Sequence, residues 1–368
     1  MALSTVDALV RRGCRALVTV PEPGPLVPAL EAAGAEVALC PSPILRKSAL
    51  RPAGLLRLLA TAARSVVPGL RLLRSYRPDA VYVSTLTAPL WLALARATGR
   101  RPVCHVHEAE SDLPRLLARA LAAPLALSPV IVANSAFSRD VLAAAWPRLA
   151  RRTHVVPNPV PGPGAVVPAR AELGGTVEIV YVGRLSPRKG PHVAVAALGE
   201  LRARGVDARL RLVGSVFPGY EWFERELRAA VAERGLTDHV RFLGFRPDVW
   251  SELAAADVVV VPSVADEPFG NTAVEAVLAA RPVVASGAGG LGEAVAGYGC
   301  ALTVPPDDPA ALAGALEKVV ADWPTFRAAA RADAAVAAAR HDPERYGDRL
   351  AALVIGEPTG PVAAGRAA

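Results

Sequence analysis

Apolar and polar residues alternate along this chain with two different periods. Short runs rich in Val, Ile and Leu are separated by longer stretches in which Ala and Leu recur at helical spacing. Such alternation is typical of βα units built around parallel sheets, so the pattern predicts an α/β fold. In the first half we expect strands at Ala16–Val20, Glu36–Cys40, Ala80–Ser84, Val103–Val106, Val130–Ala133 and His154–Val156. Further on we expect strands at Val177–Val182, Arg209–Val213, Val240–Leu243, Val258–Val261, Val283–Ala285 and Leu302–Val304.

A segment rich in Pro and Gly separates the two sets of strands. Residues 157–175, PNPVPGPGAVVPARAELGG, show no periodicity, which favours a linker. The length of 368 residues suits two domains. We therefore predict an N-terminal domain over 1–160, a linker over 161–176, a C-terminal domain over 177–355 and a disordered tail over 356–368. Two consecutive open α/β domains predict a ligand crevice between them, outside the carboxyl ends of the strands.

The charge is unevenly distributed between the two halves. Residues 1–175 contain 21 Lys and Arg against 10 Asp and Glu, a net +11, and the remainder contains 20 against 24, a net −4. Between Arg46 and Arg77 lie eight basic residues and no acidic one, and Arg57, Arg64 and Arg71 share one helical face. This basic stretch is either a solvated face or a surface for anionic lipid or an anionic acceptor. No nucleic-acid partner is expected, because neither interleaved aromatic residues nor a recognition module accompanies the charge.

Cysteine usage and targeting signals indicate a reducing compartment. Cys14, Cys40, Cys104 and Cys300 include no Cys-x-x-Cys pair, which argues against a structural zinc site or a disulfide framework. No signal peptide is visible, so we expect a cytoplasmic protein, peripheral at the inner face of the membrane if the basic stretch binds lipid. The uncharged residues 120–138 include prolines, and therefore predict a helix end, a turn and a buried strand rather than a membrane span.

The strongest local signal for chemistry is YVGRLSPRKG, from Tyr181 to Gly190. A buried strand ends at Gly183, and a helix begins near Pro191 after a basic loop. The glycine allows close approach of a ligand to the backbone, and the helix start supplies unpaired N–H groups. Arg184 can bind two phosphate oxygens at once, while Lys189 adds a compact charge. The sequence therefore predicts an anion site, although such a loop taken alone could equally be solvated.

A second signal is EPFGNTAVE, which places two carboxylates, Glu267 and Glu275, in one short segment. Its turn residues predict that Glu267 lies in a loop and that Glu275 lies about one turn inside a helix beginning at Thr272. Carboxylates accept hydrogen bonds from paired sugar or ribose hydroxyls, and the amides of Gly270 and Asn271 can meet a phosphate. Because the expected helix is apolar nearly all round, Glu275 needs a partner there.

With these two segments about eighty residues apart, the chain resembles the retaining glycosyltransferases of family 4, which have the GT-B fold of two facing Rossmann-like domains. The resemblance extends over nearly the whole chain and includes FLGFRPDVWSELAAADVVVVPS and RPVVASGAGGLGEAV. It implies transfer of a sugar from a nucleotide-diphosphate donor in the C-terminal half to an acceptor in the N-terminal half. It also implies donor contacts for Gly183, Arg184, Lys189, Gly214, Phe245, Glu267, Phe269, Gly270, Asn271 and Glu275. Arg184 and Lys189 would bind the diphosphate, Glu275 the ribose, and Glu267 with the backbone of 269–271 the transferred sugar.

In the first half, CHVHEAES places His105, His107 and Glu108 at a strand end. The two imidazoles point to the same side if the strand persists, but no third ligand follows at metal spacing, so no metal is expected. The resemblance implies that His107 contacts the donor sugar, with His105 structural and Glu108 on the acceptor side. No Asp-x-Asp triplet occurs either, so we expect neither a metal nor another cofactor, with the positive charge supplied by the basic loop.

The opening of the chain departs from the family pattern. Family members usually begin with a strand and a Gly-rich loop, whereas this chain starts within the expected first helix, MALSTVDALVRRG. We therefore expect a first, central strand to be missing, either because the gene starts upstream or because the chain is a real truncation. The acceptor stays open between a glycan, a lipid-linked and a small molecule. Alternatives are a nucleotide-sugar 2-epimerase-like enzyme and a non-catalytic sugar-nucleotide binder.

Overall fold

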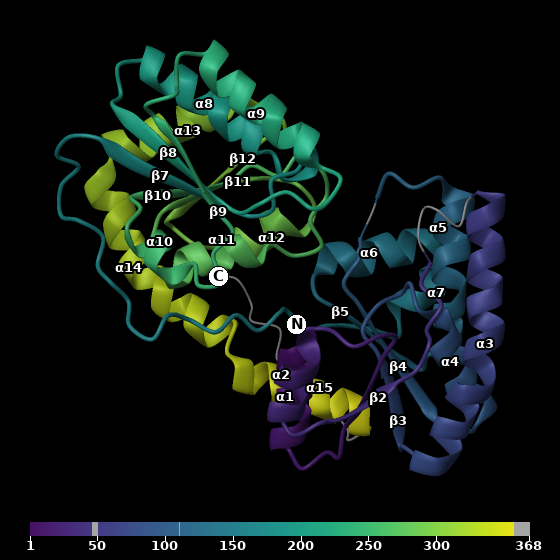
Figure 1. Ribbon diagram of the computed structural model, residues 1–368. Helices are drawn as coiled ribbons and strands as arrows, with labels where there is room; N and C mark the ends of the chain where they lie inside the picture. Colours follow the sequence, from purple (N-terminus) through teal and green to yellow (C-terminus); the bar gives the residue numbers. More distant parts are fainter. Residues whose placement is uncertain (46–50, 110, 357–368) are drawn as a thin grey trace. The chain divides into compact units, whose positions relative to one another are not determined.

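The computed structural model describes residues 1–45, 51–109 and 111–356, which form two compact units (Figure 1). The first unit comprises Met1–Pro159 and the chain from Asp342 onward, and the second comprises Val160–His341. Arg46 and Lys47 of the basic stretch lie outside the described residues, as does the expected tail beyond residue 356.

The first unit is an α/β unit whose strands pair in parallel. Its strands are β1 (Leu17–Val20), β2 (Glu36–Leu39), β3 (Ala80–Val83), β4 (Arg101–Val106), β5 (Val130–Ala133) and β6 (Thr153–Val155). Its helices are α1 (Ala2–Arg11), α2 (Leu26–Ala32), α3 (Pro52–Tyr76), α4 (Pro89–Ala97), α5 (Arg115–Ala122), the 3₁₀ turn η2 (Ala123–Leu127), α6 (Ala136–Ala145), α7 (Pro147–Ala150) and α15 (Pro343–Ile355). The interpretation of residues 120–138 as a helix end, a turn and a buried strand is confirmed by α5, η2 and β5.

The strands of this unit fall into two sheets, one of order β3-β4-β5-β6 and one formed by β1 and β2. Within the described residues, no ladder joins β1 to β3, so each of these strands is paired on one side only. The expected missing central strand stays a prediction.

Alternation of side chains along β4 builds two apolar layers on the larger sheet. Val103 faces a cluster with residues of α1 and α15, while Cys104 and Val106 face a cluster with residues of α3 to α7. All three side chains are fully buried, as the two-residue period of a strand covered on both faces requires.

Helix α15 belongs to the first unit, although residues up to 355 were expected in the C-terminal domain. The reason is its apolar face: Tyr346 and Leu350 are buried beside Leu9 of α1 and Val132 of β5. The Tyr346 hydroxyl also forms a 2.7 Å hydrogen bond with Thr5. The domain boundary predicted from the sequence did not take into account which sheet this helix covers.

The second unit is one parallel sheet of order β12-β11-β10-β7-β8-β9 with helices on both faces. Its strands are β7 (Val177–Val182), β8 (Ala208–Val213), β9 (Val240–Gly244), β10 (Val258–Val261), β11 (Val283–Ser286) and β12 (Ala301–Val304). One apolar layer packs under α8 (Pro191–Ala203), α9 (Glu221–Glu233) and α13 (Pro309–Ala321). The other packs under α10 (Trp250–Ala254), α11 (Asn271–Leu278), α12 (Gly290–Val295) and α14 (Trp323–Arg340).

The order of this second sheet determines where chemistry can occur. Because β7, β8 and β10 are parallel neighbours, the loops after them meet at one edge of the sheet. Those three loops contain the basic segment, Gly214 and Glu267.

Candidate functional site

The basic loop of the second unit has the predicted structure of strand, loop and helix start. After β7 the chain continues to the 3₁₀ turn η3 (Pro187–Lys189), and Gly190 then begins α8 in a left-handed conformation, φ 70°. A Cβ on Gly190 would lie 1.9 Å from the carbonyl oxygen of Pro262, so only glycine fits there. Gly190 thereby allows the basic loop to pack directly against the end of β10.

Three glycines bring the ends of β7, β8 and β9 together. Gly183 donates its N–H to Val213 at 2.9 Å, and Gly214 donates to Gly244 at 2.8 Å. Gly214 has φ 142°, and a Cβ there would lie 1.8 Å from the carbonyl oxygen of Gly183. These three glycines have no side chain of their own to cover the backbone, so a ligand can approach the backbone closely there. Phe245, the next residue after Gly244, is 72% exposed.

Glu267 lies beside the basic loop, a pairing that the sequence did not predict. Its carboxylate is 2.8 Å from the Lys189 ammonium and 3.9 Å from the Arg188 guanidinium, and it accepts a 3.0 Å hydrogen bond from Ser263. Glu267 is buried, and its carbonyl accepts from the Gly290 N–H at 2.7 Å. Arg188 additionally donates to the carbonyl of Asp266. One carboxylate and two basic groups are thus fixed at the carboxyl ends of β7 and β10.

Glu275 lies on α11, which begins at Asn271, one residue before the expected start. Its neighbours Val274 and Ala276 are fully buried, and Glu275 itself is half-buried. Burial raises the pKa of the Glu275 carboxyl group. No hydrogen bond or ion pair of this carboxylate is found within the described part of the chain, so its oxygens are available to a ligand that donates hydrogen bonds.

The start of α11 is fixed by small residues and one ring. Gly270 has φ 120°, and a Cβ there would lie 2.6 Å from the side chain of Leu291. Phe269 is buried, with its ring edge-on to the imidazole of His341 at 5.6 Å between centroids. The backbone of residues 269–271 is therefore held between α11 and α12, which leaves the N–H groups of the first turn of α11 at a fixed position.

Arg184 is exposed at the start of the basic loop, and its guanidinium lies 3.4 Å above the ring centroid of Phe217. Burial and the neighbouring Arg188 lower the pKa of Arg184. Sequence reasoning did not select Phe217; the signal available was an aromatic residue shortly after Gly214, in a loop that follows a strand.

In the first unit, the rings of His105 and His107 lie side by side, with centroids 4.0 Å apart and planes tilted by 33°; β4 itself ends at Val106. His105 is fully buried and its Nδ1 forms a short hydrogen bond with the hydroxyl of Tyr82. Burial lowers the pKa of His107 to about 4, so its ring is neutral at physiological pH.

Glu108 is bound within its own unit. Its carboxylate accepts hydrogen bonds from the hydroxyl of Thr85, from the N–H of Leu86 at 3.3 Å and from the N–H of His107 at 3.1 Å. Across residues 1–45, 51–109 and 111–356, no group of three or more His, Cys, Asp or Glu side chains could hold a metal ion.

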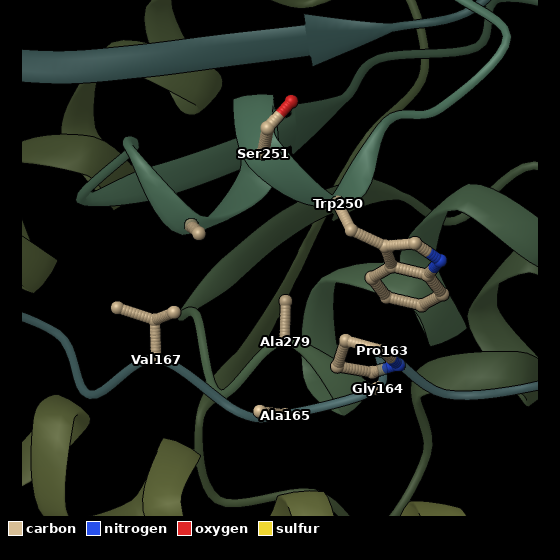
Figure 2. Close-up of a pocket in the computed structure, with 8 residues that line it drawn as sticks. Pro163, Gly164, Ala165, Val167, Trp250, Ser251 and Ala279 are labelled. Atoms are coloured by element: carbon tan, nitrogen blue, oxygen red, sulfur yellow. The ribbon is translucent and has the colours of Figure 1, made fainter.

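A separate cavity of about 180 Å³ lies in the second unit, next to the start of α10 (Figure 2). Figure 2 shows the Trp250 ring and Pro163 among its walls. The lining is mostly apolar and includes none of the predicted donor-binding residues.

Comparison with known families and proteins gives matches to both halves of the chain. Residues 1–161 match the family model described as Glycosyltransferase Family 4, and residues 169–339 match the one described as Glycosyl transferases group 1. The chain is 38% identical over 195 residues to the 2-deoxystreptamine glucosyltransferase of Streptomyces kanamyceticus, covering 50% of this chain and 49% of that protein. It is 32% identical over 275 residues to a glycogen synthase of Mycobacterium tuberculosis, covering 70% and 64%. The matched regions thus span between about a third and two thirds of these and similar curated relatives.

Among solved structures, Anabaena Alr3699/HepE in complex with UDP-glucose is similar over 95% of this chain and 94% of that one. Its TM-score is 0.78 at 25% sequence identity. The two-unit α/β architecture with parallel sheets therefore matches that of glycosyltransferases with the GT-B fold.

Proposed function

This chain belongs to the glycosyltransferases of group 1, and from that premise we propose that it transfers a sugar from a nucleotide-diphosphate donor to an acceptor, without a divalent metal and with retention at the anomeric carbon. The observation that carries the proposal is the convergence in the second unit of Lys189 and Glu267, 2.8 Å apart, with Arg184 on the same short loop as Lys189. Retention rests on the family resemblance alone.

The charges of this site suit a departing diphosphate. Arg184 presents a planar fork of donors and Lys189 a point charge, and together they stabilise the negative charge that develops as the glycosidic bond to the diphosphate breaks. These two side chains take the place that a metal ion has in other transferases. When phosphate binds, it competes with Glu267 for Lys189, and Glu267 becomes available to the sugar.

The carboxylates suit hydroxyl groups. Glu275, half-buried and without a protein partner in the described residues, accepts hydrogen bonds from the ribose hydroxyls in our proposal. Glu267 and the backbone of residues 269–271 hold the transferred sugar. For His107 of the first unit, the proposed contact with the donor sugar rests on the family resemblance, and its lowered pKa keeps the ring neutral.

The test is incubation of the purified protein with UDP-glucose and, separately, with a guanosine-diphosphate sugar, followed by NMR of the products. Transfer or slow hydrolysis that releases the nucleotide, with the sugar keeping its anomeric configuration and with EDTA having no effect, supports the proposal. An epimerised sugar nucleotide favours the epimerase-like alternative, and binding without turnover favours the non-catalytic binder. Loss of activity in EDTA that manganese or magnesium restores contradicts the metal-independent mechanism.

We further propose that the first unit contacts an anionic membrane through α3. Within the described residues, α3 is the one helix long and apolar enough to cross a membrane, with mean hydropathy 1.2 and only 11% of its most apolar window buried. Ser65, Gly69 and Leu73 are its buried residues, and none lies in its N-terminal half. A Cβ on Gly69 would lie 2.7 Å from Leu94 of α4, so α3 is anchored to the unit by its C-terminal half.

The exposed surface of α3 suits an orientation in the plane of the membrane. Leu56 and Val67, 69% and 52% exposed, recur at helical spacing and form an apolar stripe. Arg57, Arg64 and Arg71, all exposed, form a parallel basic row directly beside it. An apolar stripe bordered by basic residues is the pattern of an interfacial helix, and each arginine near an anionic surface adds about 1 kcal/mol.

Co-sedimentation with vesicles tests this contact. The protein is expected to bind vesicles that contain phosphatidylglycerol, to bind neutral vesicles less, and to dissociate as salt rises. Replacing both Arg64 and Arg71 by Gln, or both Leu56 and Val67 by Ser, should weaken binding. Replacing both Arg225 on α9 and Arg331 on α14 by Gln is the matched control for the loss of two exposed charges. Equal binding to neutral vesicles, or binding that these substitutions do not change, would contradict the membrane contact and indicate that the basic face of α3 is simply solvated.

A further inference from the structure

Arg184 is held in an unusual way for an exposed arginine. Its guanidinium carbon lies 3.4 Å from the ring centroid of Phe217, so the planar group is stacked on the aromatic face. The carbonyl of Arg184 accepts a 2.7 Å hydrogen bond from the hydroxyl of the buried Tyr181. In the part of the chain that the structure describes, the guanidinium itself makes neither a hydrogen bond nor an ion pair. Both ends of Arg184 are thus restrained while its N–H donors stay unused.

This arrangement has a specific chemical consequence. Stacking uses the face of the guanidinium, whereas phosphate oxygens bind its edge, so an aromatic ring and a diphosphate can contact the same arginine at once. Arginine keeps its charge despite the lowered pKa. A long side chain that is already oriented loses less rotamer freedom when a ligand binds. The Phe217 ring therefore orients the Arg184 guanidinium without competing with a diphosphate for its N–H donors.

Phe217 is itself fixed by its loop. The loop is joined to the basic segment by the hydrogen bond from the Leu185 N–H to the Ser215 carbonyl at 3.0 Å. The Phe217 carbonyl accepts from the Tyr220 N–H at 2.9 Å, and the Glu221 carboxylate accepts from the Gly219 N–H at 2.9 Å. The ring nevertheless remains 50% exposed and belongs to neither apolar cluster of the unit. Core packing therefore does not explain why a large apolar side chain lies there.

We propose that Phe217 is a positioning residue that holds the Arg184 guanidinium, by stacking, in the orientation in which its edge receives the donor diphosphate. Phe217 acts on binding through Arg184. The proposal rests on the proposed function, since it assumes a diphosphate ligand.

The test is calorimetric titration with UDP and with GDP of the wild type and of three variants. Phe217→Ala should weaken binding of whichever nucleotide the wild type takes by about three- to tenfold, as expected for loss of a partly exposed cation–π contact. Phe217→Leu should weaken it similarly, because leucine fills space without a π face. Phe217→Tyr should restore affinity to within about twofold, since the aromatic face remains. Trp222→Ala is the matched control: Trp222 is 42% exposed and its ring packs on Tyr220 and Phe223, so nucleotide affinity should not change.

A double-mutant cycle separates positioning from general packing. Once Arg184 is replaced by Ala, the further change Phe217→Ala should weaken binding by less than about twofold, because the two act as one unit. Full additivity of the two effects, a Phe217→Leu variant with wild-type affinity, or unchanged affinity in Phe217→Ala overturns the positioning role. Failure of the wild type to bind either nucleotide is a different result: it overturns the proposed function, and the positioning role falls with it.

Discussion

Gly190 offers a test of how closely the basic loop packs on the rest of the second unit. Gly190→Ala places a Cβ 1.9 Å from the Pro262 carbonyl oxygen, more than 1 Å inside the closest ordinary contact. Gly235 is a matched control, since it has nearly the same backbone, φ 65° against 70°, but no atom within 4 Å of an added Cβ. The two substitutions therefore share the cost of a left-handed alanine and differ only in the clash.

The magnitudes follow from these two sites. A left-handed alanine costs about 1 to 2 kcal/mol, partly offset by the lower entropy of the unfolded chain, so Gly235→Ala should cost about 1 kcal/mol. In Gly190→Ala, the backbone at residue 190 or at Pro262 must also move to relieve the clash. We set the cost of this movement at about 3 kcal/mol, by analogy with severe overpacking. For a unit of this size, 1 kcal/mol corresponds to about 2 to 4 °C in Tm. We expect a fall of roughly 3 °C for Gly235→Ala and roughly 8 to 16 °C for Gly190→Ala.

Thermal unfolding and UDP titration of the two variants test whether the contact with Pro262 sets the cost of Gly190→Ala. Moving Gly190 also separates the Arg188 carbonyl from the Val264 N–H, now 2.9 Å apart, and displaces Lys189 from Glu267. UDP affinity should therefore fall in Gly190→Ala and stay unchanged in Gly235→Ala. Equal falls in Tm for the two variants would refute the reasoning, because they would show that backbone conformation alone sets the cost.

Two further predictions concern titratable groups. Glu275→Gln should weaken UDP binding by about tenfold, the cost of a lost hydrogen bond to a charged group. It should not lower Tm, because it removes a half-buried charge that has no protein partner in the described residues. Calorimetry and thermal unfolding check this, and a lower Tm with normal UDP binding would contradict it. The free energy of unfolding should fall as pH drops from about 6.5 to about 4, because the unfolded chain protonates His107 in that window while the folded chain keeps it neutral. His107→Gln should reduce this pH dependence in denaturant titrations, and an unchanged slope would show that His107 contributes nothing to it.

Much of the fold was predictable from local patterns, for a physical reason. A strand buried on both faces is a nearly continuous apolar run, so β5 and β10, and β7 with its single Glu178, were located to the residue. The other strands were located to within two residues. The strand, glycine and helix start around the basic loop were also predictable, because their residue types determine the local backbone geometry.

Contacts between distant segments were not predictable in this way. The pairing of Lys189 with Glu267 depends on β7 and β10 being neighbours in the sheet, which no local pattern specifies. The stacking of Phe217 on Arg184 depends on a loop of no regular structure. The assignment of α15 to the first unit depends on which sheet its apolar face covers, which no local pattern specifies.

The central claim is that the basic loop of the second unit binds the donor diphosphate, and Lys189→Ala tests it most directly. Lys189 is 35% exposed, and Ser263 and Arg188 remain near Glu267 in its absence, so the variant should fold. We predict that turnover of the accepted nucleotide sugar, followed as released nucleotide, falls about a hundredfold or more, as expected for losing one group that stabilises developing charge. A folded Lys189→Ala variant that turns over the nucleotide sugar at the wild-type rate would contradict the account.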